Sequence, residues 1–118
     1  MFLPEVQSVR IQAQGRLDGE GAVTLQQQLA LIDQRCSLWI LDLAQVTFMD
    51  SAGLVALTAA HKLAKQRNAR LILCQPSSAV HLILEISQLD RVFEIAPKTT
   101  DLDRLSRTNE VPVTLQAA

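Results

Sequence analysis

Short, almost entirely apolar segments alternate along this chain with longer segments that have the periodicity of helices. Residues 38–43 and 71–74 are apolar apart from Asp42, as expected of strands that are covered on both faces. The intervening segments repeat apolar residues every three or four positions, which is typical of amphipathic helices. Strands that alternate with helices indicate an α/β fold with a mostly parallel sheet and crossover helices.

The first strand has a different pattern, because apolar and polar residues alternate from Val9 to Leu17. A period of two describes a strand with one face exposed to water. We therefore expect this strand at an edge of the sheet, and its orientation could be antiparallel to its neighbour. Gly15 interrupts the alternation, which indicates a bulge or a close approach of another backbone segment.

About four helices and a short last strand complete the expected fold. The helices are expected at 21–34, at 51–66, from 76–78 onward, and after the Thr100-x-x-Asp103 capping pattern. The last strand is expected at Val92–Ile95. A length of 118 residues favours a single domain. We assign this domain to residues 1–108, and we expect 109–118 to be a loose tail because termini are ordered only when docked.

Composition argues against nucleic acid and membrane as partners. The chain carries 11 basic and 12 acidic residues, so it lacks the basic excess of most nucleic-acid-binding proteins. No apolar stretch approaches the roughly 18 residues that a membrane-spanning helix needs. The first residues also lack the charged and apolar regions of a signal peptide. We therefore expect a cytoplasmic protein.

The cysteines and histidines predict neither a disulfide framework nor a metal site. Cys36 and Cys74 are far apart and show no CxxC spacing, and Cys74 ends a buried type of strand. His61 and His81 have no cysteine or carboxylate partner at the spacing of metal ligands. We expect no cofactor.

One serine stands where a loop is expected to become a helix, in the segment Phe48–Leu54 (FMDSAGL). The simplest interpretation is that Asp50 is the N-cap and Ser51 the first helical residue. The alternative is a functional Ser51, because a helix N-terminus can hold an anion or present a hydroxyl for modification. Gly53 costs up to about 1 kcal/mol in a helix, which indicates that a packed element or a partner lies close to the backbone.

Two other classes of protein fit the same residues less well. A hydrolase nucleophile elbow needs G-x-S-x-G, and Met49 occupies the position of the first glycine. A two-component receiver domain would take its acidic pair, phospho-acceptor and lysine from Asp18, Glu20, Asp50 and Lys98. Receivers place their acids directly after a buried first strand, whereas the first strand of this chain alternates. Asp50 also begins a helix and does not end a strand.

The surroundings of Ser51 include residues whose burial is informative. Phe48 is expected in the core. Leu54 and Val55 are expected to be partly exposed beside Ser51, where an apolar pair would suit a docking surface. Asp18 is expected to be a turn or cap residue, with a role in a site as the alternative.

Taken together, these residues resemble the STAS domain family, in particular the bacterial anti-sigma factor antagonists. The resemblance rests on Phe48–Leu54, on Leu41–Leu43 before it, and on Gly15–Asp18 (GxLD) further upstream. It covers nearly the whole chain, so residues 1–108 are expected to form a STAS-like domain.

The resemblance implies a regulatory switch. In that family, the serine that matches Ser51 is phosphorylated by a partner anti-sigma factor, which is itself a serine kinase, and a serine phosphatase removes the phosphate. The unmodified antagonist binds the anti-sigma factor and releases a sigma factor for transcription. By this resemblance the chain is a binding partner and substrate, not an enzyme, and the kinase supplies ATP and magnesium.

The resemblance also implies a surface for the partner. That surface comprises Asp18, Asp50, Ser51, Ala52, Gly53 and Leu54. The chain departs from the family pattern at Ala52, which is often serine or threonine, and at Val55, where many members have glycine. Two alternatives remain within the family. One is a STAS scaffold or subunit, in a stress-signalling assembly or a lipid-transport complex, in which Ser51 is only a contact residue. The other is a domain that binds a small molecule or nucleotide.

Overall fold

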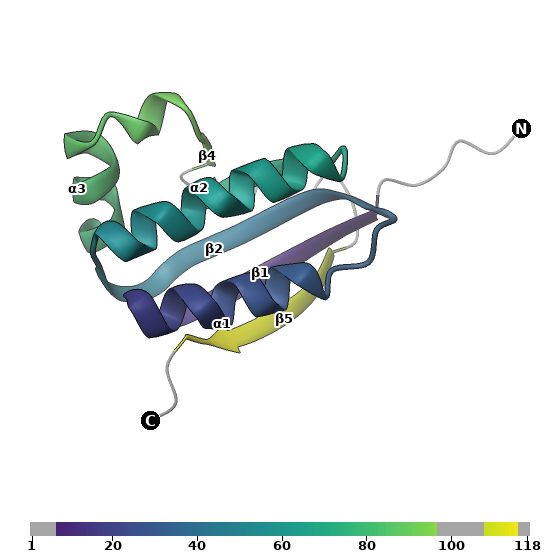
Figure 1. Cartoon of the computed structure of the whole chain (residues 1–118), viewed down its shortest axis with the longest axis horizontal. Coiled ribbons are helices and arrows are strands. Elements are labelled where there is room, and N and C mark those ends of the chain that lie inside the picture. The colour runs from purple at the N-terminus through teal and green to yellow at the C-terminus, as the bar shows by residue number, and fades with distance from the viewer. Residues whose placement is uncertain (1–6, 97–107, 116–118) are drawn as a thin grey trace, which may run out of the picture.

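Five parallel strands form one sheet in the order β4-β3-β2-β1-β5 (Figure 1). The computed structural model describes residues 7–96 and 108–115. The strands are β1 (Gln7–Leu17), β2 (Cys36–Met49), β3 (Arg70–Cys74), β4 (Glu94–Ala96) and β5 (Thr108–Thr114). The helices are α1 (Gly19–Ala30), α2 (Ser51–Gln66) and α3 (Ser78–Ile86), followed by a 3-10 turn at Leu89–Arg91. The α/β class and the mostly parallel sheet are confirmed.

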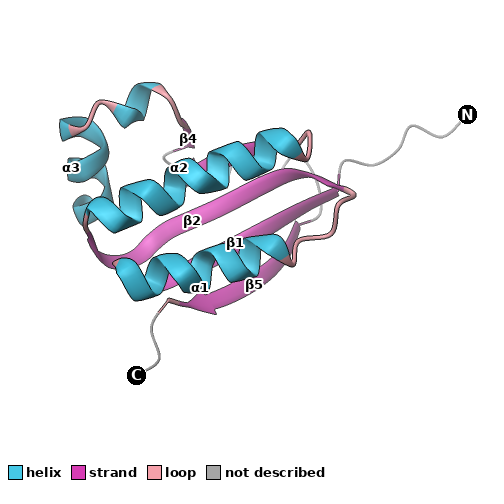
Figure 2. Ribbon diagram, viewed as in Figure 1, coloured by secondary structure: helices cyan, strands magenta, loops and turns pink. Residues whose placement is uncertain are grey.

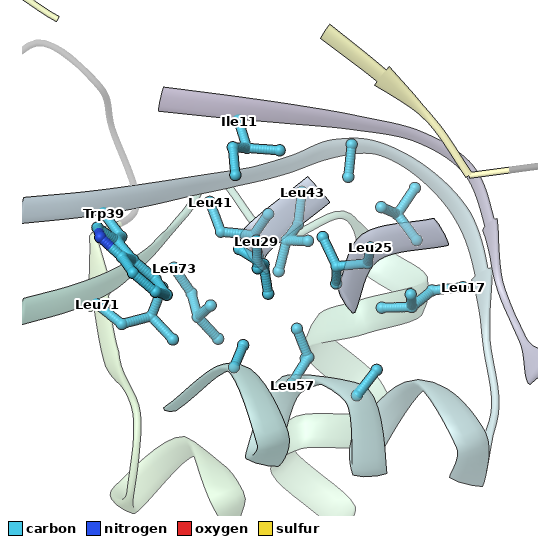
Figure 3. Close-up of a cluster of buried hydrophobic side chains, with 14 of the residues drawn as sticks. Ile11, Leu17, Leu25, Leu29, Trp39, Leu41, Leu43, Leu57, Leu71 and Leu73 are labelled. Atoms are coloured by element: carbon cyan, nitrogen blue, oxygen red, sulfur yellow. The ribbon is translucent and has the colours of Figure 1, made fainter. Parts of the chain in front are cut away.

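Helices α1 and α2 lie side by side over one face of the sheet, and α3 packs against β2 at one end (Figures 1 and 2). The main core fills the space between this helix pair and the strands (Figure 3). Its side chains that are no more than 2% exposed include Ile11, Trp39, Leu41, Leu43 and Leu73 from strands and Leu25, Leu29 and Leu57 from helices. The apolar stripes of the two helices therefore face the sheet, as their periodicity predicts.

The opposite face of the sheet is also buried across β2 and β3. A second apolar cluster there consists of Leu38, Ile40, Ile72 and Cys74. Burial on both faces explains why these strands do not alternate. The same face of β2 carries Asp42, whose carboxylate pairs with the Arg10 guanidinium at 2.6 Å. The polar exception in the apolar run is therefore a paired group and not an uncompensated charge.

The first strand is an interior strand, so the prediction of an edge strand is wrong. β1 pairs with β2 on one side and with β5 on the other, and both pairings are parallel. An antiparallel orientation is therefore also excluded. The alternation arises because the main core covers only one face of β1, while Gln12 and Gln14 remain partly or fully accessible on the other. A single polar face does not require an edge position.

The loose tail predicted from Asn109 is also wrong for the residues that form β5. That strand pairs with Ser8 to Gln14 of β1, and Val113 and Leu115 are buried in the core. The Leu115 N–H donates to the Gln14 carbonyl at 2.9 Å. Docking onto β1 therefore orders this segment. The helix predicted after Thr100, and Lys98 with it, lie outside the described residues.

The second strand is longer than predicted, and the expected loop around Phe48 is part of it. β2 has one extra residue relative to β1 between Asp42 and Gln45, and its register with β1 shifts again beside Gly15. Gly15 has a φ of 103°, so the predicted bulge is confirmed. After these shifts Phe48 faces outward and is 40% exposed, so its predicted burial in the core is wrong.

Candidate functional site

Two strand-to-helix turns lie next to each other at the carboxyl ends of β1 and β2, which we call this edge of the sheet. β1 ends at Leu17 and β2 at Met49, and these two residues are partners in the parallel ladder. The residue directly after each strand is the N-cap of a helix, Asp18 for α1 and Asp50 for α2. Because paired strands lie about 4.8 Å apart, the two caps occupy neighbouring positions.

Both aspartates act as caps through their side chains. The Asp50 carboxylate accepts hydrogen bonds from the N–H groups of Ala52 at 3.0 Å and Gly53 at 3.2 Å. The Asp18 carboxylate accepts one from the N–H of Gly21 at 3.1 Å. These bonds satisfy N–H groups that lack partners within the first helical turn. The predicted capping role of each aspartate is confirmed, and α2 begins at Ser51 as expected.

A glycine follows each cap by three residues and lies against the end of β1. A Cβ atom on Gly53 would lie 2.5 Å from the Leu17 carbonyl oxygen and 2.5 Å from the Met49 Cγ atom. On Gly21 it would lie 2.2 Å from the Arg16 carbonyl oxygen. Gly53 is therefore needed for packing, one of the two explanations that the sequence left open. Gly53 is buried, so it offers no side chain to a partner and instead lets the first turn of α2 lie close to the end of β1.

The exposed side of the first turn of α2 carries Ser51 and an apolar pair. Ser51 is exposed, Leu54 is half-buried, and Val55 is 65% exposed. The predicted exposure of the apolar pair is confirmed. The pair continues into a shallow hollow of about 260 Å³, lined by Leu54, Val55, Thr58, Ala59 and Lys62. This side of α2 therefore offers a hydroxyl beside a small apolar surface.

Arg16 also belongs to this edge, and the sequence analysis missed it. Its guanidinium carbon lies 5.1 Å from the centroid of the Phe48 ring, in a cation–π contact. The same group lies 3.7 Å from the Asp18 carboxylate. Arg16 and Phe48 are ladder partners, although they are far apart in sequence. Only the register of β1 with β2 brings them together, so no short motif could have revealed the contact.

The remaining candidate side chains lie in structural contacts. His61 packs edge-on against Phe93 with ring centroids 5.6 Å apart, and His81 lies 3.8 Å from Glu85. Both cysteines are free thiols, and burial raises the pKa of the Cys36 thiol. Among the residues that the structure describes, no group of three or more metal-ligating side chains occurs.

A strongly shifted carboxyl pKa occurs away from this edge. Hydrogen bonds from Arg35 lower the pKa of Asp33 to about 2. Both residues lie in the exposed turn between α1 and β2, beyond the far end of α1 from Asp18. This pair therefore stabilises a turn and does not tune the candidate site.

The fold and this site can be compared with known proteins. The model of the STAS domain family matches residues 3–102. The chain belongs to the STAS domain family. This match confirms the resemblance seen in Phe48–Leu54 and Gly15–Asp18.

This chain is also similar in sequence to a named bacterial protein. An anti-sigma F factor antagonist of Paenibacillus polymyxa is 29% identical over 87 residues, which cover 72% of this chain and 74% of that protein. In the described part of this STAS domain, no helix has both the length and the hydrophobicity that crossing a bilayer requires.

Proposed function

We propose that this STAS protein is an anti-sigma factor antagonist whose binding to its partner is switched off by phosphorylation of Ser51. The partner is an anti-sigma factor with serine kinase activity, and a serine phosphatase restores the binding form. Family membership and the similarity to a named antagonist support this role. The structural observation that carries the proposal is that Asp50 caps α2 while Ser51 stays exposed.

The proposed partner-binding surface follows the edge around Ser51. Asp18, Asp50, Ser51, Ala52 and Leu54 contribute contacts there, and Gly53 supports them from below. Val55 and the hollow beside it extend this surface along α2. The chain supplies a hydroxyl and a docking surface and performs no catalysis. The kinase brings its own ATP and magnesium.

The switch acts at the interface and leaves the fold intact. A phosphate adds about −1.5 to −2 charges, and a helix N-terminus stabilises such an anion by about 0.3–1 kcal/mol. Asp50 opposes it, by up to about 4 kcal/mol for unit charges 4 Å apart at an effective dielectric of 20. Water weakens both effects at an exposed position. Burial of the dianion against a partner without paired cations costs several kcal/mol, and roughly every 1.4 kcal/mol is a tenfold change in affinity.

The first test measures phosphorylation directly. The protein is incubated with ATP and an anti-sigma factor kinase from the same organism, and its intact mass is determined. We expect a gain of one phosphate, which Ser51→Ala abolishes. Ser78→Ala is the matched control, because Ser78 is also the exposed first residue of a helix and is preceded by a capping residue, Ser77. A phosphate that persists in Ser51→Ala would contradict the assignment.

The second arm measures binding to the partner by calorimetry. Ser51→Asp places a negative charge at the proposed interface and should weaken binding at least about tenfold. Ser78→Asp adds the same charge at the start of α3 and should leave the affinity unchanged. Equal affinities of wild type and Ser51→Asp, together with no phosphate gain, would favour a STAS scaffold in which Ser51 is only a contact residue.

A further inference from the structure

Arg16 lies near the carboxyl end of β1, next to the turn at which Ser51 begins α2. Its side chain is 56% exposed and lies between the Phe48 ring and the Asp18 carboxylate. The next residue, Leu17, has its carbonyl oxygen directly beneath Gly53 in the first turn of α2. The strand position of Arg16 is therefore adjacent to the turn that presents Ser51.

A phosphate on Ser51 would meet a turn in which two N–H donors, those of Ala52 and Gly53, are already in use. Asp50 accepts from the N–H groups of both Ala52 and Gly53, and its carboxylate adds a negative charge beside the phosphate. A cation from outside α2 would therefore add stabilisation that this turn does not supply. The first lysine or arginine of α2 is Lys62, three turns or about 16 Å beyond Ser51 along the helix.

We propose that, when Ser51 is phosphorylated, the Arg16 guanidinium leaves the Asp18 carboxylate and forms an ion pair with the phosphate. This inference rests on the proposed function, because it concerns the phosphorylated form of Ser51. A guanidinium binds phosphate through two parallel hydrogen bonds, and the phosphate carries more charge than one carboxylate. The present Arg16–Asp18 separation of 3.7 Å is longer than the roughly 2.7–2.9 Å of a close charge-assisted hydrogen bond. The exchange therefore gives up only a loose contact.

The exchange also changes the apolar part of the surface. When Arg16 moves toward the phosphate, its guanidinium leaves the Phe48 ring, which is already 40% exposed. Phosphorylation then alters two neighbouring features: it adds negative charge at position 51, and it removes the Arg16 guanidinium from the Phe48 ring. A partner would distinguish the modified form by both features.

The test installs phosphoserine at position 51 during protein synthesis, so that no kinase is needed. Phosphorus NMR then follows the second ionisation of the phosphate with pH. A paired cation favours the dianion and lowers this pKa below its usual value of about 6. We expect the phosphate pKa to be at least about 0.5 lower in wild type than in Arg16→Gln. Arg16→Lys should give an intermediate value, because lysine keeps the charge but lacks the planar fork.

Arg35→Gln is the matched control. Arg35 is also exposed and also pairs with an aspartate two residues away, but it lies in the turn at the other end of α1. It should give the wild-type phosphate pKa. An equal pKa in wild type and Arg16→Gln, or an equal change in Arg35→Gln, would overturn the proposal.

A second readout reports the movement of Arg16 itself. The ring resonances of Phe48 should shift when phosphoserine is introduced into wild type, and this shift should be absent in Arg16→Gln. Failure here is distinguishable from failure of the proposed function, because the phosphate is present whether or not a kinase recognises Ser51. A negative kinase assay likewise leaves this pairing measurable.

Discussion

Asp18 with Gly21 and Asp50 with Gly53 repeat the same two residue types at the same spacing. In each pair the carboxylate accepts from the glycine N–H, at 3.1 Å and 3.2 Å. Each glycine also lets the first turn of its helix lie against the end of β1. The Asp-x-x-Gly pattern is visible in the sequence, but its second role depends on a contact with β1 that only the packed structure contains.

Gly53→Ala tests this contact. A Cβ atom only 2.5 Å from a backbone carbonyl oxygen forces the first turn of α2 to shift. We expect a loss of about 1–3 kcal/mol in the free energy of unfolding, as for other overpacked sites. The midpoint of urea unfolding measures it.

The control is Gly19→Ala, because a Cβ atom there would meet nothing within 4 Å. It should be neutral or stabilising by up to about 1 kcal/mol, since alanine is the better helix former. Equal stabilities of the two variants would show that the close approach at Gly53 is not a constraint.

At the scale of elements, Arg67 joins the ends of α1 and α2. It is the C-cap residue of α2. Its guanidinium donates to the α1 carbonyls of Leu29 and Ala30, each at 3.4 Å, and to the carbonyl of Ile32 just after α1, at 3.2 Å. The same group lies 5.8 Å from the centroid of the Trp39 ring. A cation at the C-terminal carbonyls of a helix is favoured by the helix dipole. This contact links the C-terminal ends of the two helices.

Arg67→Ala should therefore destabilise the domain by about 1–2 kcal/mol, a value below that for fully buried charged hydrogen bonds because the contact is partly exposed. Arg67→Lys should recover less than half of the loss, since lysine cannot donate to several carbonyls in one plane. Urea unfolding with Trp39 fluorescence measures both effects. Lys65→Ala, an exposed control in the last turn of α2, should stay within about 0.5 kcal/mol of wild type. A change of less than about 0.5 kcal/mol for Arg67→Ala as well would show that these hydrogen bonds do not stabilise the domain.

At the scale of the whole molecule, β5 completes the sheet and reaches the candidate site. It makes β1 an interior strand, and Leu115 just after it is fully buried. The Cβ atom of Leu115 would lie 3.2 Å from a Cβ atom on Gly21. The end of the described chain therefore supports the first turn of α1, beside the edge that carries Arg16 and Ser51.

Leu115→Ala tests whether this segment is part of the cooperative core. Removal of a fully buried leucine side chain should cost about 2–5 kcal/mol, which urea unfolding would show as a lower midpoint. Thr114→Ala, at the exposed neighbouring position, should change stability by less than about 0.5 kcal/mol. If both variants were equally stable, the segment would be the loose tail that its composition suggests.

Local patterns predicted the features that depend on neighbours a few residues apart. Helix α2 covers Ser51–Gln66 as expected, and Asp50 caps it. Cys74 is buried at the end of an apolar strand, as its position in the apolar run predicts. Helical periodicity and capping act within about four residues, so the sequence alone contains the information that they need.

The order of the strands and their register depend on the packing of the whole chain. The sequence determined that β1 has one apolar face, but pairing with β5 made it an interior strand. The register of β1 with β2 placed Arg16 over Phe48 and left that ring exposed, although its motif suggested a core residue. A hydrophobic pattern fixes the face that a strand buries, whereas its neighbours follow from the packing of the whole chain. Local sequence patterns therefore sufficed to identify Ser51 and its cap, whereas Arg16 and Phe48 meet only through the strand register of the folded chain.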